Sequence, residues 1–274
     1  GIMKYRTFNL ILLLFLCTYL CYGQEKVFPK TREVVSINIP KEKFHLYLLI
    51  GQSNMAGRGT VEPQDTLGNS KILCLNRDGD WEIAKDPIHF DKPVAGVGPG
   101  LSFAREMLKT ADKDIVIGLI PCAAGGSSID IWLQDRFWEQ TKTYPYNNTI
   151  LRTKLALKDG TLKGILWHQG EADSSPQKRE LYVQKCTQLI KKIRYFFKCL
   201  DVPFIAGELP SFNKNAKDFN PRLYEIKKHT INFDIVPSDA FTSLPDNVHL
   251  DAQSARELGK RYANKMKNMN RHEK

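Results

Sequence analysis

Short apolar runs alternate with longer amphipathic stretches along most of the chain. The runs that are rich in large or β-branched apolar residues have the length of buried strands and cover residues 44–50, 71–75, 114–120, 162–167 and 202–209. The intervening stretches place apolar residues at helical spacing and predict helices at 99–109, 177–198, 221–228 and 251–267. Continuous apolar strands that alternate with helices are typical of a parallel sheet covered on both faces. The pattern therefore predicts one α/β domain over residues 24–274.

The first residues of the chain have a different pattern. Lys4 and Arg6 precede the apolar run 10–16, which is shorter than the roughly 20 residues of a membrane span. A basic start followed by a short apolar run is typical of a secretory signal peptide. We therefore expect residues 1–23 to be a signal peptide and the protein to be secreted or periplasmic. The two residues before Met3 are interpreted as a cloning scar, and lipid attachment to a cysteine of this segment is the less favoured alternative.

The chain is basic, with 40 Lys and Arg against 30 Asp and Glu and a formal net charge of +10. The lysine pairs at 191–192 and 227–228 lie in predicted helices, where solvated faces explain them better than nucleic-acid binding does. The same charge would attract an acidic polysaccharide. We therefore expect no nucleic-acid partner, and no stable membrane span after signal cleavage.

The cysteines beyond the signal peptide show neither a CxxC pair nor the spacing of a zinc site; they are Cys74, Cys122, Cys186 and Cys199. An oxidising compartment would permit disulfides, whereas buried free thiols explain the cysteines equally well. The sequence therefore predicts no metal site and leaves the pairing of these thiols open.

Polar and glycine-rich motifs follow three of the predicted strands. Gly51-Gln52-Ser53-Asn54 follows the first strand, residues 123–128 follow the third, and His168-Gln169-Gly170-Glu171 follow the fourth. Sites of parallel sheets form at the carboxyl ends of the strands, so these loops are expected to converge. A serine in such a loop either caps the next helix or acts as a nucleophile, which requires a base to take its proton.

A carboxylate and an imidazole occur together near the C-terminus, in Asp246-Asn247-Val248-His249. Acyl transfer needs an imidazole that takes the serine proton and a carboxylate that orients the imidazole. Taken singly, His249 would be read as a surface residue or a helix cap. Together with Ser53, the pair predicts a catalytic triad.

The tetrahedral intermediate of acyl transfer also needs hydrogen-bond donors for its oxyanion. Candidates are the backbone N–H of Ser53, a glycine N–H within 96–100 and the side-chain amide of Gln169. Glu171 either orients Gln52 or Gln169, contacts the substrate, or is a solvated loop carboxylate.

The ordered motifs resemble those of the SGNH hydrolase superfamily, in particular its sialate O-acetylesterase-like branch, which includes the acetyl xylan esterases of carbohydrate esterase family 6. The resemblance rests on Gly51-Gln52-Ser53-Asn54-Met55, Gly98-Pro99-Gly100, residues 121–126, residues 167–171 and residues 246–249. It implies a flavodoxin-like three-layer α/β/α sandwich with a central parallel sheet. It also implies hydrolysis of acetyl esters on sugars without a metal or another cofactor.

The resemblance further implies the roles of individual residues. Ser53 matches the nucleophile, His249 the base and Asp246 its orienting carboxylate, while Ser53, Gly98 and Gln169 match the oxyanion donors. Gly100 is an alternative to Gly98. Other residues expected to bind substrate or to support the site are Gln52, Asn54, Glu171, Gly125, Gly126 and Ser127.

Two further side chains have alternative interpretations. Trp132 either stacks on a sugar or belongs to the core, and Arg58 either meets a carboxylate of an acidic sugar or is solvated. The sequence thus predicts a secreted serine esterase that acts on acetylated xylan, a pectin-type glycan or sialic acid. The alternatives are a non-catalytic carbohydrate-binding protein on the same fold and a lipase or thioesterase of the superfamily.

Overall fold

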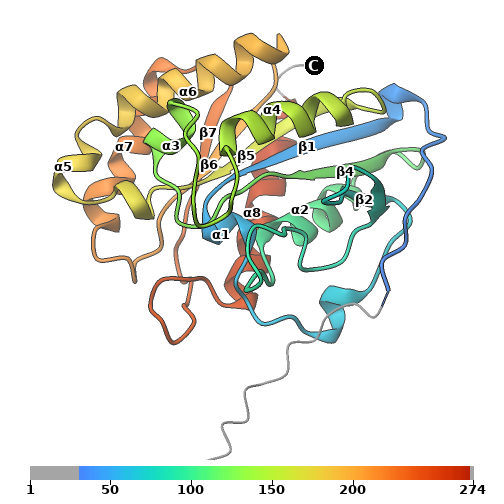
Figure 1. The fold of residues 1–274 in the computed structure, drawn as a ribbon, viewed down its shortest axis with the longest axis horizontal. Coiled ribbons are helices and arrows are strands. Elements are labelled where there is room, and N and C mark those ends of the chain that lie inside the picture. The colour runs from blue at the N-terminus through green and yellow to red at the C-terminus, as the bar shows by residue number, and fades with distance from the viewer. Residues whose placement is uncertain (1–30, 272–274) are drawn as a thin grey trace, which may run out of the picture.

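The computed structural model describes residues 31–271, so the expected signal peptide at 1–23 lies outside the described residues. A seven-stranded sheet with the order β3-β2-β4-β1-β5-β6-β7 forms its centre (Figure 1). Only the pair β2–β3 is antiparallel, and all other neighbours are parallel. The strands are β1 (Phe44–Gly51), β2 (Ile72–Leu75), β3 (Trp81–Ile83), β4 (Val116–Pro121), β5 (Thr161–His168), β6 (Phe204–Gly207) and β7 (Phe233–Val236).

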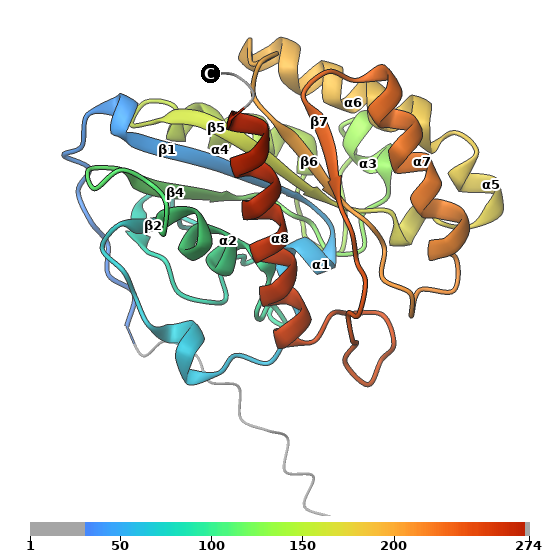
Figure 2. The same cartoon turned by 180° about the vertical axis from the view of Figure 1, so that it is seen from behind.

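Helices cover both faces of this sheet. One face carries α3 (Ile129–Leu133), α4 (Pro145–Ala156) and α6 (Tyr182–Phe197), with α7 (Ala216–His229) packed beside α6 (Figure 1). The other face carries α2 (Pro99–Leu108) and α8 (Ala252–Arg271), which pack against each other (Figure 2). Short helical segments complete the chain: α1 (Ser53–Ala56), α5 (Pro176–Arg179), and the 3-10 turns η1 (Lys41–Lys43), η2 (Pro63–Thr66) and η3 (Glu171–Asp173). The expected three-layer α/β/α architecture is confirmed.

Strand β1 shows why its sequence is apolar at every position from Leu46 to Ile50. Leu46, Leu48 and Ile50 belong to the hydrophobic core under α4 and α6. Tyr47 and Leu49 point to the opposite core, under α2 and α8. Because successive side chains of a strand alternate between the faces, a strand at the centre of a covered sheet must be apolar at every position.

The predicted elements agree with the structure except for four missed elements, one divided helix and one helix with an earlier start. The short edge strands β3 and β7 and the helices α3 and α4 were not predicted. The predicted helix 177–198 is divided into α5 and α6. Helix α7 begins at Ala216 and contains Pro221, which was expected to be its first residue. Phe219, buried against Tyr182, anchors a turn before this proline, so packing outweighs the hydrogen bond that proline cannot donate.

Two general features concern the described part of the chain. Within residues 31–271, no helix combines the length and the apolar character that a membrane span requires. Cys74, Cys122, Cys186 and Cys199 are free thiols, and all of them are buried.

Candidate active site

The loops that follow three adjacent strands meet at one edge of the sheet. Strand β1 lies between β4 and β5, so the residues after Gly51, Pro121 and His168 come together there. The loop 237–251, which links β7 to α8, lies on the same side, at the bottom of Figure 1. The sheet order thus collects motifs that are far apart in the sequence.

Ser53 begins helix α1 directly after the end of β1. Gly51 adopts a φ of +127°, and a Cβ atom there would lie 2.1 Å from the backbone oxygen of His168. Only glycine fits this position, since other residues would be strained and would collide with β5. The resulting sharp turn places the Ser53 side chain in a cavity at the edge of the sheet.

The hydroxyl of Ser53 is in hydrogen-bonding contact with His249. The distance from Ser53 Oγ to His249 Nε2 is 3.1 Å, and His249 Nδ1 lies 2.6 Å from Asp246 Oδ2. The structure therefore brings together the three residues that were predicted to form a triad. This arrangement allows an imidazole to take the serine proton while a carboxylate fixes its orientation.

Asp246 also holds the backbone of its own turn. The backbone N–H groups of Val248 and His249 donate to Asp246 Oδ1, at 2.9 and 3.0 Å. Partial burial would raise the pKa of Asp246, but these hydrogen bonds and the His249 ring lower it overall. Asp246 is thus held as a carboxylate beside the imidazole.

Asn54 fastens the loop of His249 to the nucleophile turn. Its Nδ2 donates to the backbone oxygen of Val248 at 3.3 Å and to Glu171 Oε1 at 2.6 Å. Its Oδ1 accepts the backbone N–H of Leu250 at 2.9 Å. Asn54 and Glu171 are thereby placed beneath the triad, and the two bonds to the backbone bracket His249.

The side-chain amide of Gln169 is engaged within the protein. Its Nε2 lies 2.5 Å from Asp173 Oδ2 and 3.2 Å from both Gln52 Oε1 and the Ser127 backbone oxygen, and its Oε1 accepts the Tyr182 hydroxyl at 2.8 Å. Gln169 is fully buried and does not line the cavity that holds Ser53. The prediction of Gln169 as an oxyanion donor is therefore not supported by the geometry, because two N–H groups already face three acceptors.

The side-chain amide at the cavity belongs to Gln52 rather than to Gln169. Its Oε1 receives two donors, Gln169 Nε2 and the backbone N–H of Ala172, each at 3.2 Å, which fixes the orientation of the amide. Gln52 lines the cavity beside Ser53, and no acceptor within residues 31–271 contacts its Nε2. The free amide N–H groups at this cavity thus belong to Gln52.

Gly98 is not among the residues that line the cavity. It precedes the first turn of α2, where a Cβ atom would meet the Met55 backbone oxygen at 2.9 Å and Gly57 at 3.1 Å. Gly100 lies further along α2, and a Cβ atom there would meet the Leu49 side chain at 2.7 Å. These glycines allow α2 to pack closely against the core, and neither lines the cavity around Ser53.

The loop after β4 provides a glycine that does line the cavity. Gly126 has a φ of +78°, and no described residue accepts its backbone N–H. The neighbouring Gly125 N–H donates to Asp91 Oδ2 at 2.9 Å, and Asp91 forms a buried ion pair with Arg58 at 2.8 Å. The Arg58 side chain is therefore neither solvated nor free to meet a substrate carboxylate, and the pair fixes the glycine loop instead.

Two other predicted substrate-binding residues belong to the interior. The Ser127 hydroxyl donates to the Ala124 backbone oxygen at 2.7 Å and accepts the Trp132 indole N–H at 2.8 Å. Trp132 is fully buried and packs edge-on against Trp167. Neither Ser127 nor Trp132 lines the cavity, so the core interpretation of Trp132 is the one that the structure supports.

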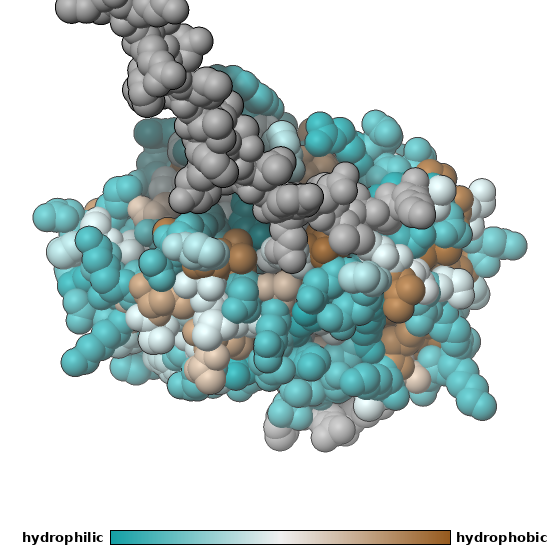
Figure 3. All heavy atoms as spheres, turned by 90° about the horizontal axis from the view of Figure 1, so that it is seen from below, coloured by the Kyte–Doolittle hydropathy of each residue, from teal (hydrophilic) through white to brown (hydrophobic). Residues whose placement is uncertain are grey.

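The cavity around Ser53 has a volume of about 510 Å³. Several of its lining residues were not predicted from the sequence: Lys92, Val94, Gln140 and Leu244. None of them lies in a motif of its own, so no local signal could have identified them. Figure 3 views the molecule from the side of the loop 237–251, and the described surface there is mostly hydrophilic. Within residues 31–271, no group of three or more His, Cys, Asp or Glu side chains is placed to hold a metal ion.

The chain is similar to known carbohydrate esterases. A probable carbohydrate esterase of Arabidopsis thaliana is 32% identical over 246 residues, which cover 81% of this chain and 90% of that protein. A crystal structure of an Arabidopsis thaliana protein matches with a TM-score of 0.73 at 30% identity, over 82% of this chain and 98% of that one.

Two more distant structures show the same fold. NanS matches with a TM-score of 0.65 at 17% identity, over 86% of this chain and all (100%) of that one. A carbohydrate acetylesterase from Xanthomonas citri matches with a TM-score of 0.61 at 16% identity, over 80% of this chain and 54% of that one. The family model for carbohydrate esterases described as sialic acid-specific acetylesterases matches residues 43–268. The chain therefore belongs to this family of carbohydrate esterases.

Proposed function

We propose that this protein is a serine esterase that removes O-acetyl groups from carbohydrates through an acetyl-enzyme on Ser53. The observation that carries the proposal is the position of His249, which lies within hydrogen-bonding distance of both Ser53 Oγ and Asp246 Oδ2. The family membership supports the ester and sugar classes, since its members are carbohydrate acetylesterases.

The first half of the reaction forms the acetyl-enzyme. His249 Nε2 takes the proton of Ser53 as Oγ attacks the acetyl carbonyl carbon, and Asp246 stabilises the imidazolium. The protonated His249 then donates its proton to the sugar oxygen, and the bond between the acetyl carbon and this oxygen breaks. In the second half, His249 takes a proton from water as the water oxygen attacks the acetyl carbon. The bond between this carbon and Ser53 Oγ then breaks, His249 returns the proton to Oγ, and acetate is released.

The oxyanion needs donors in the same cavity. We assign this role to the backbone N–H groups of Ser53 and Gly126 and to Nε2 of Gln52, because no acceptor within residues 31–271 contacts them. Removing one such donor typically costs about 10²- to 10³-fold in kcat. Gln52 therefore takes the place that the sequence motifs had suggested for Gln169.

The substrate and the location of the enzyme are further parts of the proposal. Acetylated xylan, pectin-type glycans and sialic acid are the candidate substrates, and the segment 1–23 is proposed to direct secretion. The mature N-terminus of the protein recovered from a culture medium, determined by mass spectrometry, tests the secretion proposal. A protein that stays in the cell with residues 1–23 attached would refute it.

Release of acetate from acetylated sugars tests the catalytic proposal. The purified protein and its Ser53→Ala variant are compared on acetylated xylo-oligosaccharides, acetylated oligogalacturonides and O-acetyl sialic acid. Acetate release from at least one substrate, abolished in the variant, is expected. A protein that binds these sugars without releasing acetate would instead be a carbohydrate-binding protein, and preference for an octanoyl over an acetyl ester would indicate a lipase or thioesterase.

A further inference from the structure

A second cavity adjoins the one that holds Ser53. It has a volume of about 800 Å³ and lies along the segment 87–93 that leads toward α2. Lys92 and Gln140 line both cavities and form the wall between them, with Lys92 Nζ 2.5 Å from Gln140 Oε1. The two cavities together are larger than a single sugar ring requires, and both side chains of the shared wall are polar.

Two cations of this pair of cavities have no carboxylate partner among residues 31–271. Lys92 contacts only the Gln140 amide, and its neighbour Asp91 is already bound to Arg58 and Gly125. Arg77, which lines the second cavity, donates to the Phe90 backbone oxygen at 3.0 Å and lies over the Phe90 ring. Burial and the charge of Arg58 lower the pKa of Lys92, so an anion beside its ammonium group would be favourable.

The other two cations that line the second cavity, Arg32 and Lys142, are paired with carboxylates. Arg32 pairs with Glu82 at 3.3 Å, and Lys142 pairs with Glu139. Asp78 is the lining carboxylate of this cavity without a cationic partner among the described residues, and both Asp78 and the neighbouring Arg77 are exposed. In the second cavity, Lys92 and Arg77 therefore face one unpaired carboxylate, and the Asp246 carboxylate of the first cavity is engaged by the His249 ring.

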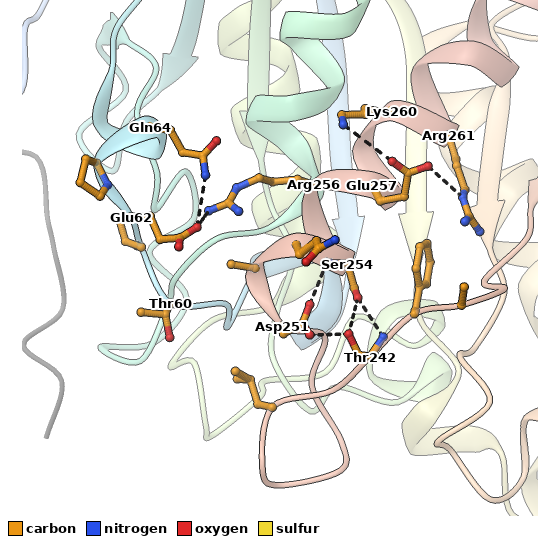
Figure 4. A pocket seen from close by; sticks show the side chains of 17 residues that line it. Thr60, Glu62, Gln64, Thr242, Asp251, Ser254, Arg256, Glu257, Lys260 and Arg261 are labelled. Atoms are coloured by element: carbon orange, nitrogen blue, oxygen red, sulfur yellow. Dashed lines mark hydrogen bonds and ion pairs between the residues drawn. The ribbon is translucent and has the colours of Figure 1, made fainter.

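A larger cavity on the other side of the loop 237–251, which carries Asp246 and His249, has cations that are all paired within the protein (Figure 4). It measures about 1290 Å³ and is lined by η2, the loop 240–244 and the start of α8. Each of its cations is matched within the protein: Arg256 binds Glu62 and Asp65, while Lys260 and Arg261 bind Glu257. A cation that is matched in this way contributes to the fold, whereas Lys92 and Arg77 are available to a ligand.

We propose that the two adjoining cavities bind an acidic oligosaccharide, with the acetylated sugar at Ser53, a carboxylate at Lys92 and the carboxylate of a further sugar at Arg77. The proposal rests on the acetylesterase function proposed above and extends it to a substrate class. Charge-assisted hydrogen bonds from an ammonium and a guanidinium group are suited to uronic acid carboxylates. A polymer with a carboxylate on each sugar would meet both cations in succession.

The test compares acetylated trigalacturonic acid with acetylated xylotriose as substrates of the full-length enzyme at low salt. Lys92→Met and Arg77→Met are each expected to lower the ratio of kcat/KM for the acidic trimer to that for the neutral trimer by about tenfold, mainly through KM. For acetylated monomeric galacturonic acid, Arg77→Met is expected to have no effect, because one sugar does not span both cavities. Lys260→Met, in the cavity of Figure 4, is the matched control and should leave the ratio unchanged.

Two results would overturn the inference. One is an unchanged ratio in both variants, and the other is an equal loss on the acidic trimer and monomer in Arg77→Met. Failure of the proposed function itself is distinguishable, because the wild-type enzyme would then release no acetate from either trimer.

Discussion

Two polar regions of the site differ in exposure. One is the loop 237–251, which carries Asp246 and His249, and the other is the buried layer around the Gln169 amide. The side chains of Asp246 and His249 are 43% and 25% exposed, and their hydrogen bonds are within their own turn or to Ser53. Gln169, by contrast, has no exposed surface, and its contacts join β5 to the loops after β1 and β4. The exposed groups can change protonation and reach a substrate, whereas the buried groups hold the loops in place.

Mutations in the two regions should therefore have different effects. Loss of the His249 side chain should remove catalysis and leave the fold intact, because its ring contacts only Asp246 and Ser53 among the described residues. Loss of a buried amide should destabilise the fold, because its partners would remain buried without hydrogen bonds. Gln52 belongs to both regions, since its Oε1 is engaged in the buried layer and its Nε2 is free at the cavity.

The largest expected effect follows from His249→Ala. Without the imidazole no group takes the proton of Ser53, so kcat for an acetyl ester should fall by at least about 10³-fold. The free energy of unfolding, measured by urea denaturation, should change by less than about 1 kcal/mol. Residual activity within tenfold of the wild type would show that another base serves Ser53.

Gln52→Glu separates the two functions of Gln52. A carboxylate retains an acceptor for the Ala172 N–H but has no N–H for the oxyanion, so kcat should fall by about 10²- to 10³-fold with a smaller change in KM. Steady-state kinetics on p-nitrophenyl acetate provide the measurement. An unchanged kcat would remove Gln52 from the oxyanion site.

Gln169→Leu is the matched change in the buried layer. It removes the buried hydrogen bonds of the Gln169 side chain to the Asp173 carboxylate and the Tyr182 hydroxyl, so the free energy of unfolding should fall by about 2–3 kcal/mol. The folded variant should retain kcat to within about tenfold, because this amide does not line the cavity. A loss of kcat as large as that of Gln52→Glu, with unchanged stability, would return the oxyanion role to Gln169.

The smallest effect concerns His168, which is fully buried beside Gln169. Burial lowers the pKa of His168 below its ordinary value of 6.5, so the unfolded state binds the proton more strongly than the folded state. Stability should therefore fall as the pH drops below 6.5, and His168 contributes at most about 2 kcal/mol of this loss at pH 5.

Replacement of His168 by Gln should reduce that acid-dependent loss, as measured by urea denaturation at pH 7.5 and pH 5. Some loss should remain, because burial also lowers the pKa of His89, to about 4. The same loss in wild type and variant would show that His168 is not kept neutral by the fold.

The sequence predicted the parts of the site that depend on neighbouring residues. Strand β1 and the turn at Gly51 follow from a continuous apolar run that ends at glycine. Asp246 and His249 are three residues apart, and one turn brings them together. Local patterns of this kind do not require knowledge of the sheet order.

The oxyanion donors expected from the motifs differ from those that we assign from the structure, because their positions depend on the order of the strands in the sheet. Gly98 was chosen from a motif, but strand β4 is the neighbour of β1, and this places Gly126 rather than Gly98 at the cavity. Gln52 and Gln169 are both amides in motifs, and contacts between residues 117 positions apart in the sequence decide that Gln52 is the one that lines the cavity. Strand β7 was missed because it is short and contains Asp234.

Covalent labelling of the nucleophile tests the central claim most directly. The protein is treated with a fluorophosphonate, which reacts with activated serines, and the modified peptide is mapped by mass spectrometry while acetyl ester hydrolysis is followed. We expect one label per chain on Ser53, loss of activity in proportion to labelling, and no labelling in His249→Ala. Inactivation with the label on another residue, or full activity after complete labelling of Ser53, would contradict the account.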